Sequence, residues 1–255
     1  MPDATHPTAQ PGGAHSATEA RLAPPGSVET SVETPAMAPH VTVRRARFVD
    51  VPGVARLLTA DHPVVDLDGD GRPDAPVDPE QLSSATRLVL SHGILEQGEI
   101  WVAEDTDGLR AATVWLPPEV PAFEDELREV LVREVGVDPL DEPADDEPVR
   151  VATRQALGVA QSAIADALDA VRPRLVLVAA AVAPDVEGAD RTDTLRRLVD
   201  APASAQHSLD GLPVDGPLFT AIVDPARVEG MRSIGFVEHR SVGLEHGTLW
   251  IGVRA

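Results

Sequence analysis

The sequence has 255 residues and contains no cysteine, no tyrosine and no lysine. Without cysteine, the chain can form neither disulfides nor thiolate metal sites, and no thiol can act as a nucleophile. All 21 of its basic residues, histidine aside, are therefore arginine. Aromatic residues make up 3% of the chain, and the longest apolar run, Leu175–Ala183, is much shorter than a membrane-spanning helix. The function does not rest on cysteine chemistry.

Positive charge is also scarce, because 42 acidic residues face 21 arginines and give a net charge of −21. Such a chain repels nucleic acid and anionic membranes, and no arginine cluster is large enough to override this. A cationic substrate would instead be attracted. The N-terminus lacks the basic start and apolar core of a secretory signal, so we expect a cytoplasmic protein. The bias toward Arg, Ala, Val, Asp and Pro indicates a GC-rich, bacterial genome.

The first 40 residues differ in composition from the rest of the chain. They are rich in Pro, Ala, Thr, Gly and Ser and have almost no large apolar side chain. Such a segment cannot bury enough surface to offset the entropy of ordering it, so we predict a disordered tail over residues 1–40. The remainder, 41–255, is predicted to form one folded domain, since 43% of the chain is apolar.

Hydrophobic periodicity predicts an α/β domain in which a sheet is flanked by helices. Strands are expected over residues 41–48, 99–105, 109–117, 174–184, 216–224, 235–243 and 248–254. Helices are expected over residues 50–60, 78–93, part of 119–150, 151–171, 189–201 (ended by Pro202) and 225–235. The apolar runs 174–184 and 216–224 are typical of strands that are buried on both faces.

An acidic stretch, DLDGDGRPD at residues 66–74, has the alternating spacing of a calcium loop. Its candidate ligands are Asp66, Asp68, Asp70 and Asp74. The twelfth position, where an EF-hand has a bidentate glutamate, is Val77 here, although shorter nine-residue calcium loops lack that ligand. An acidic, glycine-rich turn without a metal is the alternative interpretation.

Three stretches together resemble the GNAT superfamily of N-acetyltransferases. VTVRRARFVDVPGVARLL (41–58) resembles the family's opening strand and helix. LVLVAAAVAPDVEGADRTDTLRRLV (175–199) resembles its central strand and the loop and helix that hold the coenzyme A pyrophosphate. DPARVEGMRSIGFVEHR (224–240) resembles its last helix and the strand after it. Within the superfamily, IWVAED, TVWLPPE and the acidic segment after them are most similar to the puromycin N-acetyltransferase branch.

The resemblance implies a mostly antiparallel sheet and transfer of an acetyl group from acetyl-CoA to a primary amine of a small, cationic molecule. It implies direct attack in a ternary complex, with a backbone N–H near Val182 stabilising the oxyanion. The residues that it places at the cofactor are Val182, Ala183, Val186, Gly188, Ala189, Asp190, Arg191, Thr192 and Arg227. A non-catalytic binding or regulatory protein with impaired coenzyme A binding is the alternative, and the sequence does not indicate an oligomeric state.

The cofactor loop departs from the family pattern. Of its glycines only Gly188 is kept, and Glu187 and Asp190 put negative charge where the ligand carries phosphates. Asp190 is a candidate N-cap for the helix that follows. The position of the family's thiolate-protonating tyrosine is Met231, which cannot donate a proton, and an asparagine that helps to hold the cofactor is replaced by Arg227.

Removal of a proton from the substrate ammonium needs a base. Glu104 and Glu119 are candidates, because both lie at the ends of predicted strands that can face an acceptor. Ordinary solvated carboxylates are the alternative for both. The acidic stretch 119–150 is either a solvated face or lid, or part of a pocket for a cationic amine.

Overall fold

The computed structural model describes residues 41–60, 79–118, 148–204, 216–244 and 247–255, and all structural statements concern these residues. They belong to one compact unit that spans Ala38–Ala255. The predicted tail, the candidate calcium loop and Glu119 lie outside them, so the domain boundary near residue 41 stays a prediction. Among the described residues, no helix is long and apolar enough to cross a membrane.

Seven described strands form one sheet in the order β1-β2-β3-β4-β5-β7-β6. The strands are β1 (Thr42–Arg45), β2 (Glu99–Asp105), β3 (Gly108–Leu116), β4 (Leu175–Val182), β5 (Leu218–Ile222), β6 (Val237–Leu244) and β7 (Gly247–Arg254). Neighbouring strands are antiparallel, except that β4 and β5 run parallel. The predicted mixed α/β class with a mostly antiparallel sheet is confirmed.

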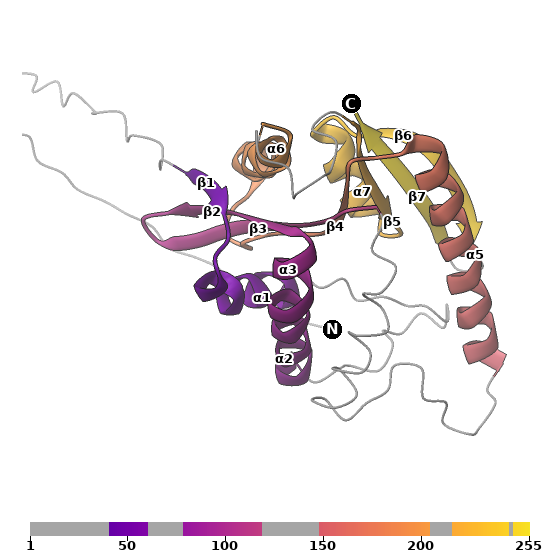
Figure 1. Ribbon diagram of the computed structural model, residues 1–255, viewed down its shortest axis with the longest axis horizontal. Helices are drawn as coiled ribbons and strands as arrows, with labels where there is room; N and C mark the ends of the chain where they lie inside the picture. The colour runs from indigo at the N-terminus through magenta and orange to yellow at the C-terminus, as the bar shows by residue number, and fades with distance from the viewer. Residues whose placement is uncertain (1–40, 61–78, 119–147, 205–215, 245–246) are drawn as a thin grey trace, which may run out of the picture. The chain divides into compact units, whose positions relative to one another are not determined.

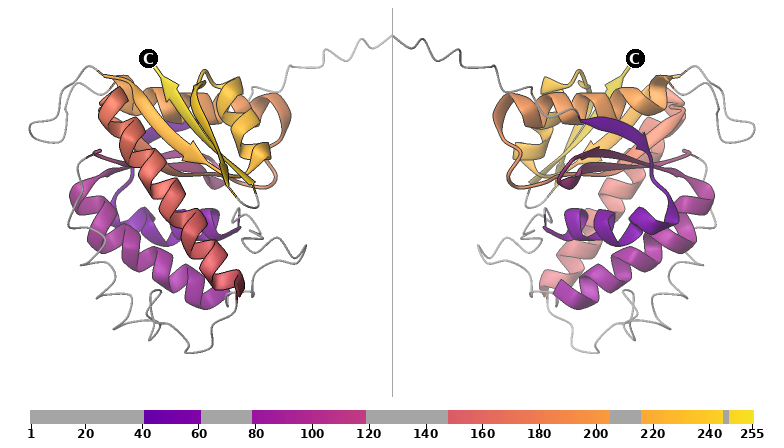
Figure 2. Two further views of the ribbon diagram at one scale, coloured as in Figure 1. Left: turned by 90° about the vertical axis from the view of Figure 1, so that its right-hand side faces the viewer. Right: turned by 90° about the vertical axis from the view of Figure 1, so that its left-hand side faces the viewer.

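Helices cover both faces of this sheet (Figure 1). They are η1 (Phe48–Asp50), α1 (Val51–Ala60), α2 (Pro79–Val89), the π-helical turn η2 (Leu90–Ile94), α3 (Leu95–Gln97), α5 (Pro148–Val171), α6 (Gly188–Ser204) and α7 (Pro225–Ser233). Helices α6 and α7 pack on one face, and α1, η2 and α3 pack on the other. Figure 2 shows α5 crossing the β5, β7 and β6 end of the sheet, on the face opposite α6 and α7.

The two cores follow from the alternation of side chains along each strand. On β5, Leu218 packs toward α6 and α7, whereas Phe219 packs toward α5. On β3, Trp115 faces α6 and α7, and Val114 faces α1 and η2. Each of these buried side chains contributes on the order of 1.5–3 kcal/mol, so the same strands hold helices on both faces of the sheet.

Two predicted helix ends are wrong. Gly93 was expected to close the second helix, but it lies buried inside η2, and the helix continues to Gln97. The helix over 189–201 was expected to end before Pro202, but α6 includes Pro202 and ends at Ser204. A proline in the last turn removes a single helical hydrogen bond, the one that its own N–H would donate. The Pro202 carbonyl, which lies too close to the end of α6 for a helical donor, accepts a bond from Arg174.

Candidate active site

Strands β4 and β5 separate after three residue pairs. Leu175, Val176 and Leu177 pair with β5, but the rest of β4 pairs with β3 alone. Val178 is an extra residue in β4, because Leu177 lies opposite Trp115 and Ala179 lies opposite Val114. The resulting bulge changes the direction of β4 where its pairing with β5 ends.

The apolar sequence of both parallel strands had predicted full burial, and this is wrong next to the point of separation, whereas Ala181 and Val182 at the end of β4 are buried. Val178 is 48% exposed, and Val223, directly after β5, is 42% exposed. The reason is that each strand loses its neighbour on one side there. At the last paired position the buried hydroxyl of Thr220 donates to the carbonyl of Leu177 at 3.2 Å. This hydrogen bond lies at the closed end of the opening between the two strands.

The edge of β4 that faces this opening carries unpaired backbone groups. Ala183 N–H donates to the Arg110 carbonyl on the β3 side at 2.7 Å. Because donors alternate between the two sides of an antiparallel strand, the N–H groups of Ala180 and Val182 point away from β3. No described strand pairs with them there. The Val182 N–H therefore faces the opening, as an oxyanion donor at that position requires, whereas the Ala183 N–H is already used.

A tight turn leads from this edge into α6. Val186 N–H donates to the Ala183 carbonyl at 3.0 Å, and Arg191 N–H donates to the Glu187 carbonyl at 3.3 Å. The helix begins at Gly188, whose φ is +57°, a conformation that glycine adopts without strain. The first-turn N–H groups, up to Asp190, have no acceptor within the helix and can bind an anion.

The predicted capping role of Asp190 is wrong, because Asp190 lies in the first turn of α6 and not before it. Its carboxylate is exposed there. The Thr192 hydroxyl donates back to the Gly188 carbonyl at 3.4 Å. Three predicted cofactor residues, Gly188, Ala189 and Asp190, thus present backbone N–H groups at the helix start, while Val186 packs its side chain against the core.

Two arginines lie at the junction of β4 and α6. Arg191 Nη1 donates to the Val182 carbonyl at 3.4 Å, so this guanidinium lies against the open end of β4. Arg110, at the start of β3, contacts Asp185 through Nη2 at 2.8 Å and Asp105 through Nε at 3.1 Å. The hydrogen bond to Arg110 lowers the pKa of Asp185, and the same bond raises the pKa of Arg110.

Helix α7 begins directly after β5 and has its own cap. The Asp224 side chain accepts from Ala226 N–H at 2.8 Å, and it lies 3.6 Å from Arg227 Nε. The predicted cofactor residue Arg227 thus sits at the start of α7, beside the carboxyl end of β5. Met231 is 6% exposed and packs in the core, where its side chain can offer no proton to a thiolate.

Glu104 is held in an ion-pair cluster near the β1 edge of the sheet. Its carboxylate accepts two bonds from Arg44, at 2.7 and 2.8 Å, and Arg44 also contacts Asp50 at 2.7 Å. The hydrogen bond from Arg44 lowers the pKa of Glu104. A lowered pKa makes a carboxylate a weaker base, which argues against the predicted role of Glu104.

The other predicted sites are not tested. Glu119 and the four aspartates of the 66–74 stretch lie outside the described residues. Within the described part of the chain, no group of three or more Asp, Glu or His side chains is placed to hold a metal ion. Sequence reasoning missed Arg110, Asp185 and Thr220. The contact between Arg110 and Asp185 joins residues 75 positions apart, and no local sequence pattern indicates it.

The sequence matches no family model and no curated protein. Solved structures do resemble the fold. The C-terminal condensation domain of Ebony, solved with β-alanyl-dopamine, has a TM-score of 0.53 at 10% identity, over 85% of this chain and 99% of that one. A Corynebacterium glutamicum ATCC 13032 protein described as histone acetyltransferase HPA2 and related acetyltransferase has a TM-score of 0.50 at 16% identity, over 84% and 95%.

A mosquito arylalkylamine N-acetyltransferase, like 5b, has a TM-score of 0.50 at 11% identity, over 84% of this chain and 99% of that one. At identities this low, a likeness establishes the fold alone. Each of the three structures is covered over 95% or more of its own length. The chain has the fold of the GNAT acetyltransferases.

Proposed function

We propose that this chain is an N-acetyltransferase of the GNAT superfamily, which moves an acetyl group from acetyl-CoA to a primary amine of a small, cationic molecule in the cytoplasm. The observation that carries the proposal is the open edge of β4, which leads directly into the first turn of α6. Acyltransferases and an arylalkylamine N-acetyltransferase among the similar structures support it. We also propose that, within the superfamily, the chain is most similar to the puromycin N-acetyltransferase branch.

The open edge suits an acyl thioester of coenzyme A. The pantetheine arm contains two amides in an extended chain, and such a chain can pair with unpaired strand groups as an added strand would. The N–H groups of Ala180 and Val182 and the carbonyl of Ala180 supply partners. The diphosphate would then pass the N–H groups at the start of α6.

In the transfer, the lone pair of the free amine attacks the thioester carbonyl carbon and forms the C–N bond. The carbonyl oxygen becomes an oxyanion, which a backbone N–H on β4, from Ala180 or Val182, would stabilise. Collapse of this intermediate breaks the C–S bond, and the electron pair leaves with sulfur as a thiolate. The amine nitrogen loses one proton to a base or to water, and the thiolate gains one from solvent.

No side chain is assigned to the protonation of the thiolate. Met231 cannot protonate the thiolate, and the chain has no tyrosine that could replace it. A thiolate is a tolerable leaving group without an acid, because free thiols have a pKa of roughly 8.5. Glu119 remains a proposed base, whereas the Arg44 ion pair makes Glu104 a poor one. Catalysis then rests on positioning and on the oxyanion donor.

A non-catalytic binding protein is the second candidate. Two observations favour it: the buried Met231 in place of an acid, and the carboxylates of Asp185, Glu187 and Asp190 around the start of α6. Such a protein would keep the opening between β4 and β5 as a binding site and would transfer nothing.

A thiol-release assay decides between these candidates. Because the chain has no cysteine, a thiol-reactive dye reports only coenzyme A that is set free. We expect release that requires acetyl-CoA and a primary amine together, with the N-acetyl product detected by mass spectrometry. Binding without release for a broad panel of amines would favour the non-catalytic candidate, and neither binding nor release would contradict both.

The variant Val182→Pro sharpens this test. Proline removes the N–H that faces the opening, but this N–H does not contribute to the ladder with β3. Because the Val182 side chain is 3% exposed in the core, we expect the melting temperature to fall as well, so kcat is compared where both proteins are folded. If this N–H is the oxyanion donor, kcat falls there by about 100-fold or more. Ala180→Pro is the matched variant for the other N–H on this edge, and unchanged kcat in both variants would contradict an oxyanion donor on β4.

A further inference from the structure

The junction of β4 and α6 carries more negative than positive charge. Asp185, Glu187 and Asp190 lie within six residues of one another, and all three are exposed. Asp185 is 64% exposed, so its carboxylate faces solvent even while it contacts Arg110. The start of α6 thus combines N–H groups that favour an anion with carboxylates that repel one.

The arginines at this junction do not reverse that balance. Arg110 lies between two carboxylates, those of Asp105 and Asp185, which together exceed its single charge. Arg191 lies against the Val182 carbonyl, at the end of the strand. The Asp105 side chain is only 7% exposed and offsets the charge of Arg110, so the exposed carboxylates of Asp185, Glu187 and Asp190 outweigh the remaining positive charge of these two arginines.

The neighbouring edge of β4 has the opposite preference. It offers the backbone N–H groups of Ala180 and Val182 and the carbonyl of Ala180, and the side chains beside them are alanine and valine. The Val182 carbonyl is already bound by Arg191. An uncharged, amide-containing arm satisfies such an edge, because its own N–H and carbonyl groups pair there without bringing charge near the carboxylates.

Building on the proposed acyl transfer, we propose that the acyl donor is selected by its pantetheine thioester arm and that its phosphates oppose binding. Acetyl-pantetheine, which carries no phosphate, is then at least as good a donor as acetyl-CoA. Acetyl-CoA binds through the same arm, against repulsion between its diphosphate and the carboxylates of Glu187 and Asp190. This reverses the contribution that a phosphate site at a helix start makes.

Salt dependence gives the first test. We compare acetyl-CoA, acetyl-4′-phosphopantetheine and acetyl-pantetheine at low salt, with one amine at a fixed concentration. We expect kcat/KM to fall in the order acetyl-pantetheine, acetyl-phosphopantetheine, acetyl-CoA. Raising NaCl to about 0.5 M screens the repulsion, so kcat/KM for acetyl-CoA should rise about threefold or more while that for acetyl-pantetheine changes less than about twofold.

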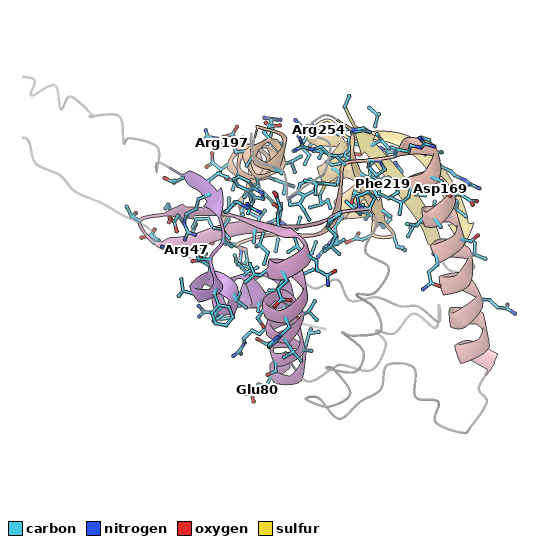
Figure 3. All side chains as sticks on the ribbon, in the orientation of Figure 1. Arg47, Glu80, Asp169, Arg197, Phe219 and Arg254 are labelled. Carbon is cyan, nitrogen blue, oxygen red and sulfur yellow. The ribbon has the colours of Figure 1, made fainter. Side chains whose placement is uncertain are left out.

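Charge-neutralising variants give the second test. The double variant Glu187→Gln/Asp190→Asn should raise kcat/KM for acetyl-CoA about three- to tenfold at low salt. It should leave kcat/KM for acetyl-pantetheine unchanged. The matched control is Asp166→Asn/Asp169→Asn on α5, which removes the same charge from two exposed side chains on the other face of the sheet. Figure 3 shows Asp169 on α5, away from Arg197 on α6. The control should change kcat/KM for neither donor.

The outcomes separate the inference from the proposed function. A preference for acetyl-CoA of about tenfold or more, weakened by salt, would overturn the inference and leave acyl transfer intact. If no donor releases thiol, calorimetry with the same three donors decides, because tighter binding of acetyl-pantetheine supports the inference even without transfer. Binding of acetyl-CoA alone, or of none of the three, would overturn it.

Discussion

At the scale of single residues, Arg44 joins three elements of the fold. Its guanidinium contacts Asp50 at the end of η1 and Glu104 on β2, while Arg44 itself lies on β1. Hydrogen bonds from a charged donor are stronger than neutral ones, and both carboxylates are bound in bidentate geometry. The cluster therefore stabilises the β1 edge and is not available for proton transfer.

This cluster makes stability depend on pH. The hydrogen bond from Arg44 lowers the pKa of Asp50 from 3.8 to about 2, and the Asp50 side chain is 10% exposed. A lowered folded-state pKa contributes stability above the ordinary pKa, and this contribution is lost as the pH falls from about 4 toward 2. We expect Asp50→Asn to lower the free energy of unfolding by up to about 2 kcal/mol at pH 7 and by much less near pH 2.5.

Urea denaturation of both proteins between pH 2.5 and 7 checks this prediction. Asp166→Asn is the control, because Asp166 is an exposed residue 3.8 Å from Arg240 and such pairs contribute little. A difference between wild type and Asp50→Asn that is constant with pH would show that the carboxylate charge is not what stabilises the fold.

Glycine 98 is a second residue on which the fold depends. It is buried at the start of β2, and a Cβ there would overlap the carbonyl oxygen of Trp115. We expect Gly98→Ala to destabilise the protein by about 2–4 kcal/mol, because backbone cannot move aside as a side chain can. Gly158→Ala in α5 is the matched control, since its Cβ meets open space and should stabilise by about 0.5–1 kcal/mol. Equal effects in thermal unfolding would contradict the steric explanation.

At the scale of elements, the function depends on where β4 and β5 stop pairing. The bulge at Val178 and the bond from Thr220 to the Leu177 carbonyl lie at that point. Parallel strands that continued side by side would satisfy the β4 edge internally and leave no backbone groups for a ligand. The opening is thus a property of two elements together, and neither strand encodes it alone.

Thr220→Val tests this junction. The substitution keeps the shape of the side chain and leaves the buried Leu177 carbonyl without its hydroxyl donor, so we expect a loss of about 1–2 kcal/mol in the free energy of unfolding. Thr59→Val is the comparison, because the Thr59 hydroxyl donates to a helix carbonyl at a partly exposed position and should matter less than about 0.5 kcal/mol. Similar losses in the two variants would contradict the role of Thr220.

How far the sequence predicted these elements depends on whether the signal is local. Strand β2 was predicted over its observed residues, because a short apolar run followed by the turn residues Thr106, Asp107 and Gly108 is a local pattern. The separation of β4 from β5 was missed, because an apolar run reports hydrophobicity and not the presence of a neighbour. The end of α6 was misplaced, since a local rule about Pro202 could not foresee the bond from Arg174.

The candidate site shows the same difference between features with a local sequence signal and contacts between distant residues. The turn before α6 was found from its sequence, because a strand, a glycine and a helix start follow one another along the chain. The contacts of Arg110 with Asp185 and of Glu104 with Arg44 were not found, since each joins residues 60 or more positions apart. The environment of a charged side chain, and with it the pKa that decides its chemistry, could not be predicted from the sequence alone.

At the scale of the whole molecule, composition limits the acid–base chemistry. A chain without lysine, tyrosine and cysteine has no side chain that ordinarily titrates between about pH 8.5 and 11. If the chain transfers acyl groups, the pH dependence of kcat/KM in that range must come from the amine. We expect its midpoint to move with the pKa of the amine used, and one midpoint shared by amines of different pKa would contradict this.

The central claim is that the open edge of β4 binds the acyl donor. Amide hydrogen exchange measured by NMR, with and without saturating acetyl-pantetheine, tests it most directly. Ala181 and Ala183 already donate to β3, so their exchange should change little. The account predicts that the donor slows exchange at Ala180 and Val182, whose N–H groups face the opening. Binding of the donor with unchanged exchange at both residues would contradict it.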